Sequence, residues 1–144
     1  MAEDNTDARE LPDWMQEHMQ KYLATKGEDG HIWKGVPTLL LTTTGRRSGN
    51  PVMVPLIYGQ QDDQYIVVGS KGGNMDHPYW YLNLVAQPMV QVQVAADRFV
   101  AKARTATLQE RPAIWELMAK IWPAYDEYQS KTDREIPLVV LERA

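Results

Sequence analysis

The sequence predicts an α+β fold that is mainly β, with six strands around one core and about three helices. Short runs of β-favouring residues alternate with turns rich in glycine, asparagine and aspartate. Most of these turns are too short for a crossover helix, so neighbouring strands should pair antiparallel. The 144 residues suffice for one domain, 1–144, with a buried core. Six short antiparallel strands around one core are typical of a small barrel.

The chain is expected to begin with a frayed segment and one amphipathic helix. Residues 1–10 are polar, and from Pro12 apolar residues recur at helical spacing, which predicts a helix over 12–26 that ends before Gly27. One interpretation is a helix packed on the body, which we favour. The other is a mobile lid whose Trp14 and Met15 cover a ligand.

The remaining elements follow from apolar patterning and end signals. The apolar centre at 39–41 is typical of a strand covered on both faces. Thr107 and Glu110 form a capping-box pattern, and Pro123 should stop the helix that follows. Helices are expected at 76–87 and 107–122. Strands are expected at 36–43, 52–58, 65–68, 90–94, 99–106 and 136–141.

Composition excludes several classes of chemistry. The chain has no cysteine, which rules out disulfides, thiolate catalysis and cysteine-ligated metals. Its three histidines have no neighbours at metal-ligand spacing, so no metal is expected. The sequence contains no G-x-S-x-G elbow, no dinucleotide fingerprint and no P-loop. A bound organic cofactor would therefore carry any catalysis.

The charge distribution bears on partners and location. Residues 1–30 hold eight acids and three bases, and the rest of the chain is close to neutral. A duplex-binding surface is usually far more basic, so no nucleic-acid partner is expected. No apolar run approaches the roughly 20 residues of a membrane span. We therefore expect a cytoplasmic protein without stable membrane insertion.

One turn concentrates positive charge between two expected strands. It has two guanidinium groups, a hydroxyl and flexible glycines, and no acid occurs between Thr38 and Gln61. Such a turn can bind phosphate through arginine side chains and backbone N–H groups, or it can be an ordinary solvated hairpin tip. From the turn alone, both interpretations stay open. Its residues are Gly45, Arg46, Arg47, Ser48, Gly49 and Asn50.

A second cationic turn and two aromatic clusters favour the first interpretation. Ser70 and Lys71 begin a glycine-rich turn, and Trp80 and Asn83 follow it. Together with the basic turn they favour a planar, phosphorylated ligand on the barrel. The second cluster is spaced by three residues, so a helical turn would bring its members to one side. It consists of Trp122, Tyr125 and Tyr128.

Four segments, in order and at matching spacing, resemble the deazaflavin-dependent nitroreductase family. They are TTTGRRSGNP at 42–51, SKGG at 70–73, HPYWYLNL at 77–84 and YDEYQSKTDREIP at 125–137. The family comprises split-β-barrel reductases of actinobacteria and mycobacteria that use reduced coenzyme F420. The resemblance runs from about residue 11 to 143. It implies a six-stranded antiparallel split β-barrel, similar to the FMN-binding split barrels.

The resemblance also implies roles for individual residues. Pro55 and Leu56 would lie along the deazaflavin ring system, and Ile57 would face the acceptor. Residues expected to hold the phosphate and acidic tail are Arg46, Arg47, Ser48, Gly49 and Asn50. Residues expected to complete the cofactor groove are Ser70, Lys71, Trp80 and Asn83. Residues expected to line the acceptor side are Trp122, Tyr125 and Tyr128.

The activity implied is hydride transfer from reduced F420 to an electron-poor acceptor. Acceptors would be quinones, enones or unsaturated esters such as coumarins, and nitroaromatics. The nitroimidazole-activating member of the family differs at the positions of Val52, Ile57 and Trp122. These differences imply a wider, more apolar pocket, which would suit quinones or enones. Ser70 and Tyr128 are the expected catalytic donors to the charge that develops on the acceptor.

Two alternatives and two open points accompany this prediction. An FMN-binding split-barrel oxidase would need fewer cations than the two basic turns supply, and a non-catalytic F420 carrier would use the same groove. The oligomeric state stays open. The first helix could bring the protein to the inner face of a membrane, although its acidic flank opposes anionic lipid.

Overall fold

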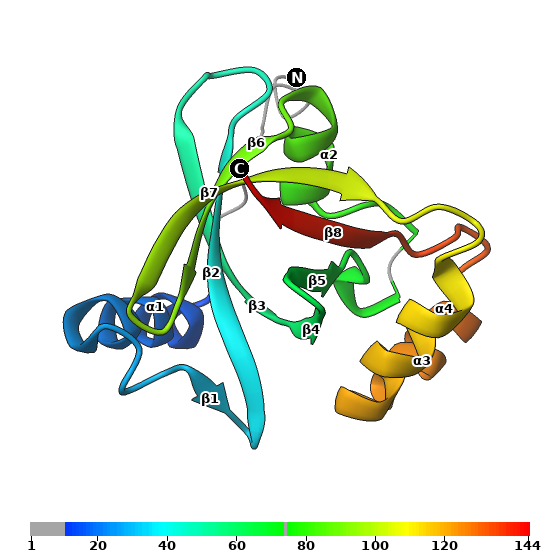
Figure 1. The fold of residues 1–144 in the computed structure, drawn as a ribbon, viewed down its shortest axis with the longest axis horizontal. Helices are drawn as coiled ribbons and strands as arrows, with labels where there is room; N and C mark the ends of the chain where they lie inside the picture. The colour runs from blue at the N-terminus through cyan, green and yellow to red at the C-terminus, as the bar shows by residue number, and fades with distance from the viewer. Residues whose placement is uncertain (1–10, 74) are drawn as a thin grey trace.

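The computed structural model describes residues 11–73 and 75–144, and residues 1–10, expected to be frayed, lie outside this part. The described residues form eight strands, four α-helices and one short 3₁₀ turn (Figure 1). The helices are α1 (Asp13–Thr25), α2 (Tyr79–Ala86), α3 (Arg111–Ile121) and α4 (Ala124–Ser130), with the turn η2 at Lys71–Gly73. The strands are β1 (Ile32–Trp33), β2 (Val36–Thr44), β3 (Pro51–Ile57), β4 (Gly59–Gln61), β5 (Gln64–Val68), β6 (Met89–Val94), β7 (Asp97–Thr105) and β8 (Leu138–Arg143).

The strands form one curved, antiparallel sheet that resembles half of a barrel. Its order is β1-β2-β6-β7-β8-β5-β4, and β3 pairs with β2 outside this path. Only Tyr58 separates β3 from β4, so a nearly continuous segment pairs first with β2 and then with β5. This switch of partners connects strands that are far apart in the order of the sheet. Figure 1 shows the resulting curvature around the centre of the molecule.

The expected numbers of six strands and about three helices were wrong. The run expected as one strand at 52–58 ends at Ile57 and is followed by the separate strand β4. Strand β1 has two residues, too few to produce a hydrophobic period. Pro123 ends α3 as expected, but it also precedes α4, because its φ of −57° suits the start of a helix.

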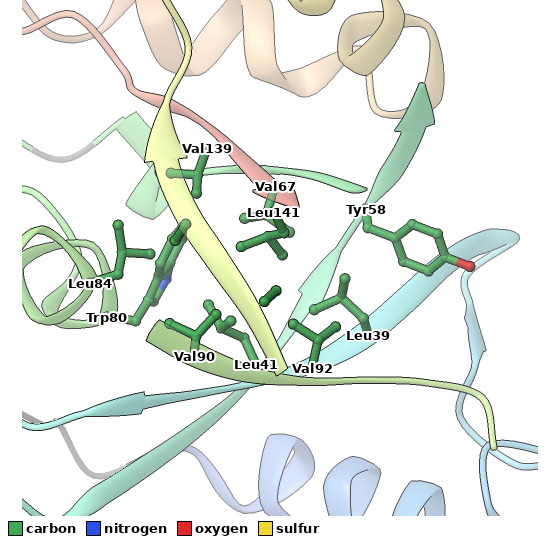
Figure 2. Packing of buried hydrophobic residues seen from close by; sticks show 12 residues of the cluster. Leu39, Leu41, Tyr58, Val67, Trp80, Leu84, Val90, Val92, Val139 and Leu141 are labelled. Carbon is green, nitrogen blue, oxygen red and sulfur yellow. The ribbon is translucent and has the colours of Figure 1, made fainter. Parts of the chain in front are cut away.

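Two hydrophobic clusters explain the continuous apolar runs of the strands. Inside the curved sheet, alternate residues of β2, β5, β6 and β8 point toward one another, and Trp80 and Leu84 of α2 cover one end (Figure 2). The intervening residues of β5 and β8 face α3 and α4 in a second cluster. In β8, Val139 belongs to the first cluster and Val140 to the second. Strands β5 and β8 are therefore covered on both faces.

Helix α1 is anchored to the sheet through Tyr22, which is fully buried. The hydroxyl of Tyr22 lies 3.0 Å from the carbonyl oxygen of Thr38 and 3.3 Å from that of Gln93. It accepts a hydrogen bond of 2.7 Å from the N–H of Ala95. These contacts join α1 to β2 and to the turn after β6. They support the interpretation of a helix packed on the body.

Helix α3 begins with a side-chain cap that the sequence predicts, whereas helix α2 begins without one. Thr107 and Glu110 exchange the two hydrogen bonds of a capping box, at 2.9 and 3.2 Å, just before α3. Helix α2 begins at Tyr79 behind Pro78, without a side-chain cap, three residues later than expected. Among the helices of residues 11–73 and 75–144, none has the length and apolar character needed to cross a membrane.

Candidate functional site

A cavity of about 500 Å³ lies where several elements meet. Most of its lining comes from the start of α1, strand β3, the turn at 70–72, the start of α2, and the junction of α3 with α4, and single residues of β1, β2 and β5 complete it. Its lining is mostly apolar, with a hydroxyl and an ammonium group at the turn. Of the residues that sequence reasoning assigned to a site, those that line it are Pro55, Leu56, Ile57, Ser70, Lys71, Trp80, Trp122, Tyr125 and Tyr128.

Strand β3 forms one wall along most of its length. Residues 52–57 all line the cavity. The strand pairs with β2 on one side only, in the register Leu40 to Pro55. Proline lacks the N–H needed in a ladder, so Pro51 and Pro55 suit a strand with one free edge. Pro55 and Leu56 contribute apolar side chains of this strand to the cavity lining.

The turn at 70–73 contributes the polar part of the lining. Ser70 is 9% exposed, and no described residue is a hydrogen-bond partner of its hydroxyl. Lys71 and Gly72 have φ of +46° and +62°, and the Nζ of Lys71 lies 5.4 Å from the ring centre of Tyr79. A methyl group on Gly73 would lie 2.7 Å from the carbonyl oxygen of Tyr128. The turn is thus packed directly on α4.

Aromatic rings on and just before α4 form the part of the wall beside the turn. The rings of Tyr125 and Tyr128 meet edge to face at 6.1 Å. Burial, and the nearby Tyr128, raise the pKa of Tyr125 above its usual value of 10.0, so its O–H stays protonated at neutral pH. Tyr128 is less buried than Tyr125. Trp122, Tyr125 and Tyr128 all line the cavity, although Trp122 lies between α3 and α4 and not on the helix that carries the two tyrosines.

Sequence reasoning missed Trp33 as part of this wall. Trp33 lies between two other tryptophans, with ring centres 5.7 Å from Trp14 and 5.6 Å from Trp122. All three line the cavity. They come from β1, α1 and the end of α3, so only the fold brings them together. The only signal in the sequence was a tryptophan between the predicted first helix and first strand, with no role assigned to it.

The basic turn does not line the cavity but extends from the same strand pair. It joins β2 to β3 and is closed by hydrogen bonds from Gly45 N–H to Asn50 O (2.8 Å) and from Gly49 N–H to Gly45 O (2.9 Å). The hydroxyl of Ser48 accepts a 3.0 Å hydrogen bond from the N–H of Asn50. Gly49 has a φ of +76° and open space where a side chain would be. Arg46 is half-buried, and Arg47 is exposed.

Asn83 also lies outside the cavity, and its position links the turn to α2. It is fully buried and accepts a hydrogen bond of 3.1 Å from the N–H of Arg46. Its amide group lies 3.2 Å from the hydroxyl of Thr43. Trp80, one turn earlier on α2, lines the cavity. A single helix therefore contacts both the cavity and the basic turn.

These features fit a planar, phosphorylated cofactor. The cavity has flat apolar walls and one cationic turn, and a second cationic turn extends from the same strand pair. Two glycines, Gly49 and Gly72, have positive φ and no atom within 4 Å of a would-be side chain, so a ligand can approach their backbone. No group of three metal-binding side chains occurs in the described part of the chain. The fold and the site thus define a split-barrel-like protein that binds an organic cofactor.

Comparison with known proteins identifies the family. The sequence model of the F420H2-dependent quinone reductases matches residues 14–143. An F420H2-dependent quinone reductase of Mycobacterium tuberculosis strain H37Rv is 38% identical over 130 residues, which cover 88% of this chain and 87% of that protein. The chain therefore belongs to the F420H2-dependent quinone reductase family. It is an oxidoreductase, and its cofactor is reduced coenzyme F420.

Two solved structures extend this comparison to the fold. A protein described as a domain-swapped dimer is 39% identical, with a TM-score of 0.72, and covers 90% of this chain and 98% of its own. The F420-H2 dependent reductase FDR-A is 42% identical, with a TM-score of 0.69, and covers 74% of this chain and 94% of its own. The family and cofactor implied by the four sequence segments are confirmed.

Proposed function

We propose that the chain reduces a quinone bound in the cavity, beside the deazaflavin ring of reduced F420. Reduced F420 supplies a hydride, and the acceptor gains that hydride and one proton to become a hydroquinone. The observation that carries the proposal is the cavity of about 500 Å³, whose mostly apolar lining includes the Ser70–Lys71 turn. Such a site can hold two flat molecules close together and exclude water, which hydride transfer requires.

We assign cofactor binding to the two cationic turns and the surfaces between them. Arg46 and Arg47, with the hydroxyl and backbone of Ser48, Gly49 and Asn50, would bind the phosphate and the acidic tail. Pro55, Leu56 and Trp80 would contact the ring system, and Ser70 and Lys71 its polar edge. Asn83 would act indirectly, because it is buried and holds the backbone of Arg46.

We assign the acceptor side to the aromatic wall. Trp122, Tyr125 and Tyr128, with Ile57, present flat apolar surface that suits quinones, and also enones or coumarins. The hydroxyls of Ser70 and Tyr128 would donate hydrogen bonds to the acceptor oxygen on which negative charge develops. The proton would come from solvent or from Tyr128. With tryptophan and isoleucine at 122 and 57, reduction of nitroimidazoles should be poor.

The decisive experiment compares binding of oxidised F420 and FMN to the parent and to Arg46→Ala/Arg47→Ala. We expect the parent to prefer F420 and the double variant to lose at least about tenfold in affinity, since each arginine contributes charge-assisted hydrogen bonds. Arg98→Ala/Lys102→Ala removes the same charge from exposed positions on β7 and should bind like the parent. Preference for FMN, or equal affinity in all three proteins, would reject the assignment.

Turnover separates an enzyme from a carrier. The parent should oxidise F420H2 in the presence of menadione, whereas a carrier would bind F420 without turnover. Ser70→Ala with Tyr128→Phe should lower kcat by a factor on the order of 10²–10³ if the two hydroxyls meet the developing charge. An unchanged kcat in that double variant would exclude this part of the mechanism.

We further propose that the protein acts in the cytoplasm and meets its quinone at the inner face of the membrane. Trp14, at the start of α1, is 49% exposed and borders the cavity. An exposed tryptophan can enter the membrane interface. Cosedimentation with phosphatidylcholine vesicles, and its loss in Trp14→Ala, would test this, and an equal soluble fraction with and without vesicles would refute it.

A further inference from the structure

The turn at 69–73 is held from behind by Arg134, a residue outside the cavity lining. Arg134 lies between α4 and β8. Its Nη2 donates to the carbonyl oxygen of Ser70 at 2.7 Å, and its Nη1 donates to that of Gly69 at 3.2 Å. Nη1 also lies 3.1 Å from Nδ1 of His77, which acts as an acceptor here. One guanidinium group thus contacts two consecutive peptide groups and His77, which lies two residues before α2.

The segment that carries Arg134 is itself fixed. The side-chain amide of Gln129 donates to the carbonyl oxygen of Arg134 at 2.8 Å, and its oxygen accepts from the N–H of Ile136 at 3.0 Å. On the other side of the contact, the N–H of Gly69 donates to Pro137 O at 2.9 Å. A methyl group on Gly69 would come within 2.8 Å of the Pro137 ring. Arg134 therefore bridges two segments that already touch closely.

This clamp determines where two backbone donors point. In a trans peptide group the C=O and the N–H point in opposite directions. Because Arg134 binds the carbonyls of Gly69 and Ser70, the N–H groups of Ser70 and Lys71 point away from it. No described residue accepts a hydrogen bond from either N–H, and both residues line the cavity. Two adjacent donors beside a lysine are suited to bind an anionic oxygen.

We infer that Arg134 is a positioning residue, which holds the turn so that the N–H groups of Ser70 and Lys71 bind an anionic or carbonyl oxygen of the cofactor. The inference rests on the proposed function for the identity of that ligand. Arg134 would act through the backbone and not by contact with the cofactor. A lysine could keep the positive charge, but it lacks the planar fork that reaches two carbonyls at once.

The test uses the whole protein and two readouts. In Arg134→Gln, hydrogen exchange at the amides of Gly69 and Gly73, followed by NMR, should become at least about tenfold faster, because charged donors no longer hold the turn. The dissociation constant of oxidised F420, measured by quenching of its fluorescence, should rise at least about tenfold. Arg134→Lys should show a smaller change in both. Arg143→Gln, which removes an exposed partner of Asp97 at the other end of β8, should match the parent.

Three outcomes would argue against the inference. Unchanged exchange and unchanged affinity in Arg134→Gln would overturn it. Faster exchange with unchanged affinity would leave Arg134 a purely structural residue. Weaker F420 binding with unchanged hydrogen exchange in Arg134→Gln, together with full F420 affinity in Arg134→Lys, would mean that Arg134 acts only through its positive charge. If Arg134→Gln does not fold, Arg134→Lys carries both measurements. A parent that binds F420 but does not reduce menadione would refute the proposed function, while the exchange and affinity results would still decide the role of Arg134.

Discussion

The N–H of Arg46 donates a 3.1 Å hydrogen bond to the side-chain oxygen of Asn83, which is fully buried. This bond joins the basic turn between β2 and β3 to helix α2. The same helix presents Trp80 to the cavity. The two regions proposed to bind opposite ends of one cofactor are therefore connected by one rigid element. Their separation should be set before the cofactor binds.

Asn83→Ala should weaken both the fold and the proposed cofactor site. It leaves the N–H of Arg46 and the hydroxyl of Thr43 without their partner, which should lower the free energy of unfolding by about 1–3 kcal/mol. We also expect weaker F420 binding, because the turn loses its support. Urea unfolding and a fluorescence titration measure the two effects. As a control, Thr43→Val removes only the hydrogen bond between Asn83 and Thr43 and should retain the F420 affinity of the parent. An F420 affinity in Asn83→Ala equal to that of the parent would contradict the proposed link between Asn83 and the basic turn.

Trp33→Ala should impair the acceptor side more than the cofactor side. Trp33 stacks on Trp14 and packs at a tilt against Trp122, so it supports both rings. Its removal should raise the KM for menadione by about tenfold, because a stacked aromatic pair contributes about 0.5–1.5 kcal/mol beyond its buried area. F420 affinity should change little. The matched control is Trp115→Ala, since Trp115 lies on α3 outside the cavity and bonds Asp126. Equal KM values in both variants would contradict this role.

Gly73→Ala should destabilise the protein more than Gly72→Ala. Both glycines have positive φ, so each alanine should cost about 1–2 kcal/mol in backbone conformation. At Gly73 the new methyl group would also lie 2.7 Å from the carbonyl oxygen of Tyr128, whereas at Gly72 it meets open space. Overpacking should add about 1–3 kcal/mol in the first variant. Chemical denaturation of the two variants gives the comparison, and equal stabilities would show that the contact with α4 is not tight.

The stability of the parent should fall in mild acid because of His77. Burial, followed by the charge of Arg134, lowers the pKa of His77 below its usual 6.5, while Asp76 acts in the opposite direction. The unfolded chain therefore takes up the proton first. The contribution of the neutral ring is present above about pH 6.5 and is lost as the pH falls through the folded pKa.

The matched variant for this effect is His77→Asn, whose side-chain oxygen can accept from Arg134 without titrating. The midpoint of thermal unfolding should fall further in the parent than in His77→Asn between about pH 7 and about pH 5. If the midpoints of the two proteins fall equally with pH, protonation of His77 does not destabilise the fold. The same measurement on Arg134→Gln would reveal whether repulsion from the guanidinium is the cause.

Much of the fold followed from patterns within short segments. The capping box of Thr107 and Glu110 and the apolar faces of the strands depend on neighbours a few residues away, and they occur as expected. Helix α4 and strand β1 were not predicted, because both are too short to show a hydrophobic periodicity. The switch from β3 to β4 was also not predicted, since Tyr58 continues the same apolar pattern while the pairing partner changes.

The sequence by itself determined the class of cofactor chemistry. The absence of cysteine and of nucleophile motifs, the two cationic turns, and the four family segments indicate reduced F420. The tertiary structure decided how those pieces meet. It placed Trp33 between Trp14 and Trp122, buried Asn83 beneath the basic turn, and brought Arg134 to the backbone of Ser70. Such contacts join residues far apart in the chain. They depend on strand register and on how helices pack on the sheet, which no local pattern encodes.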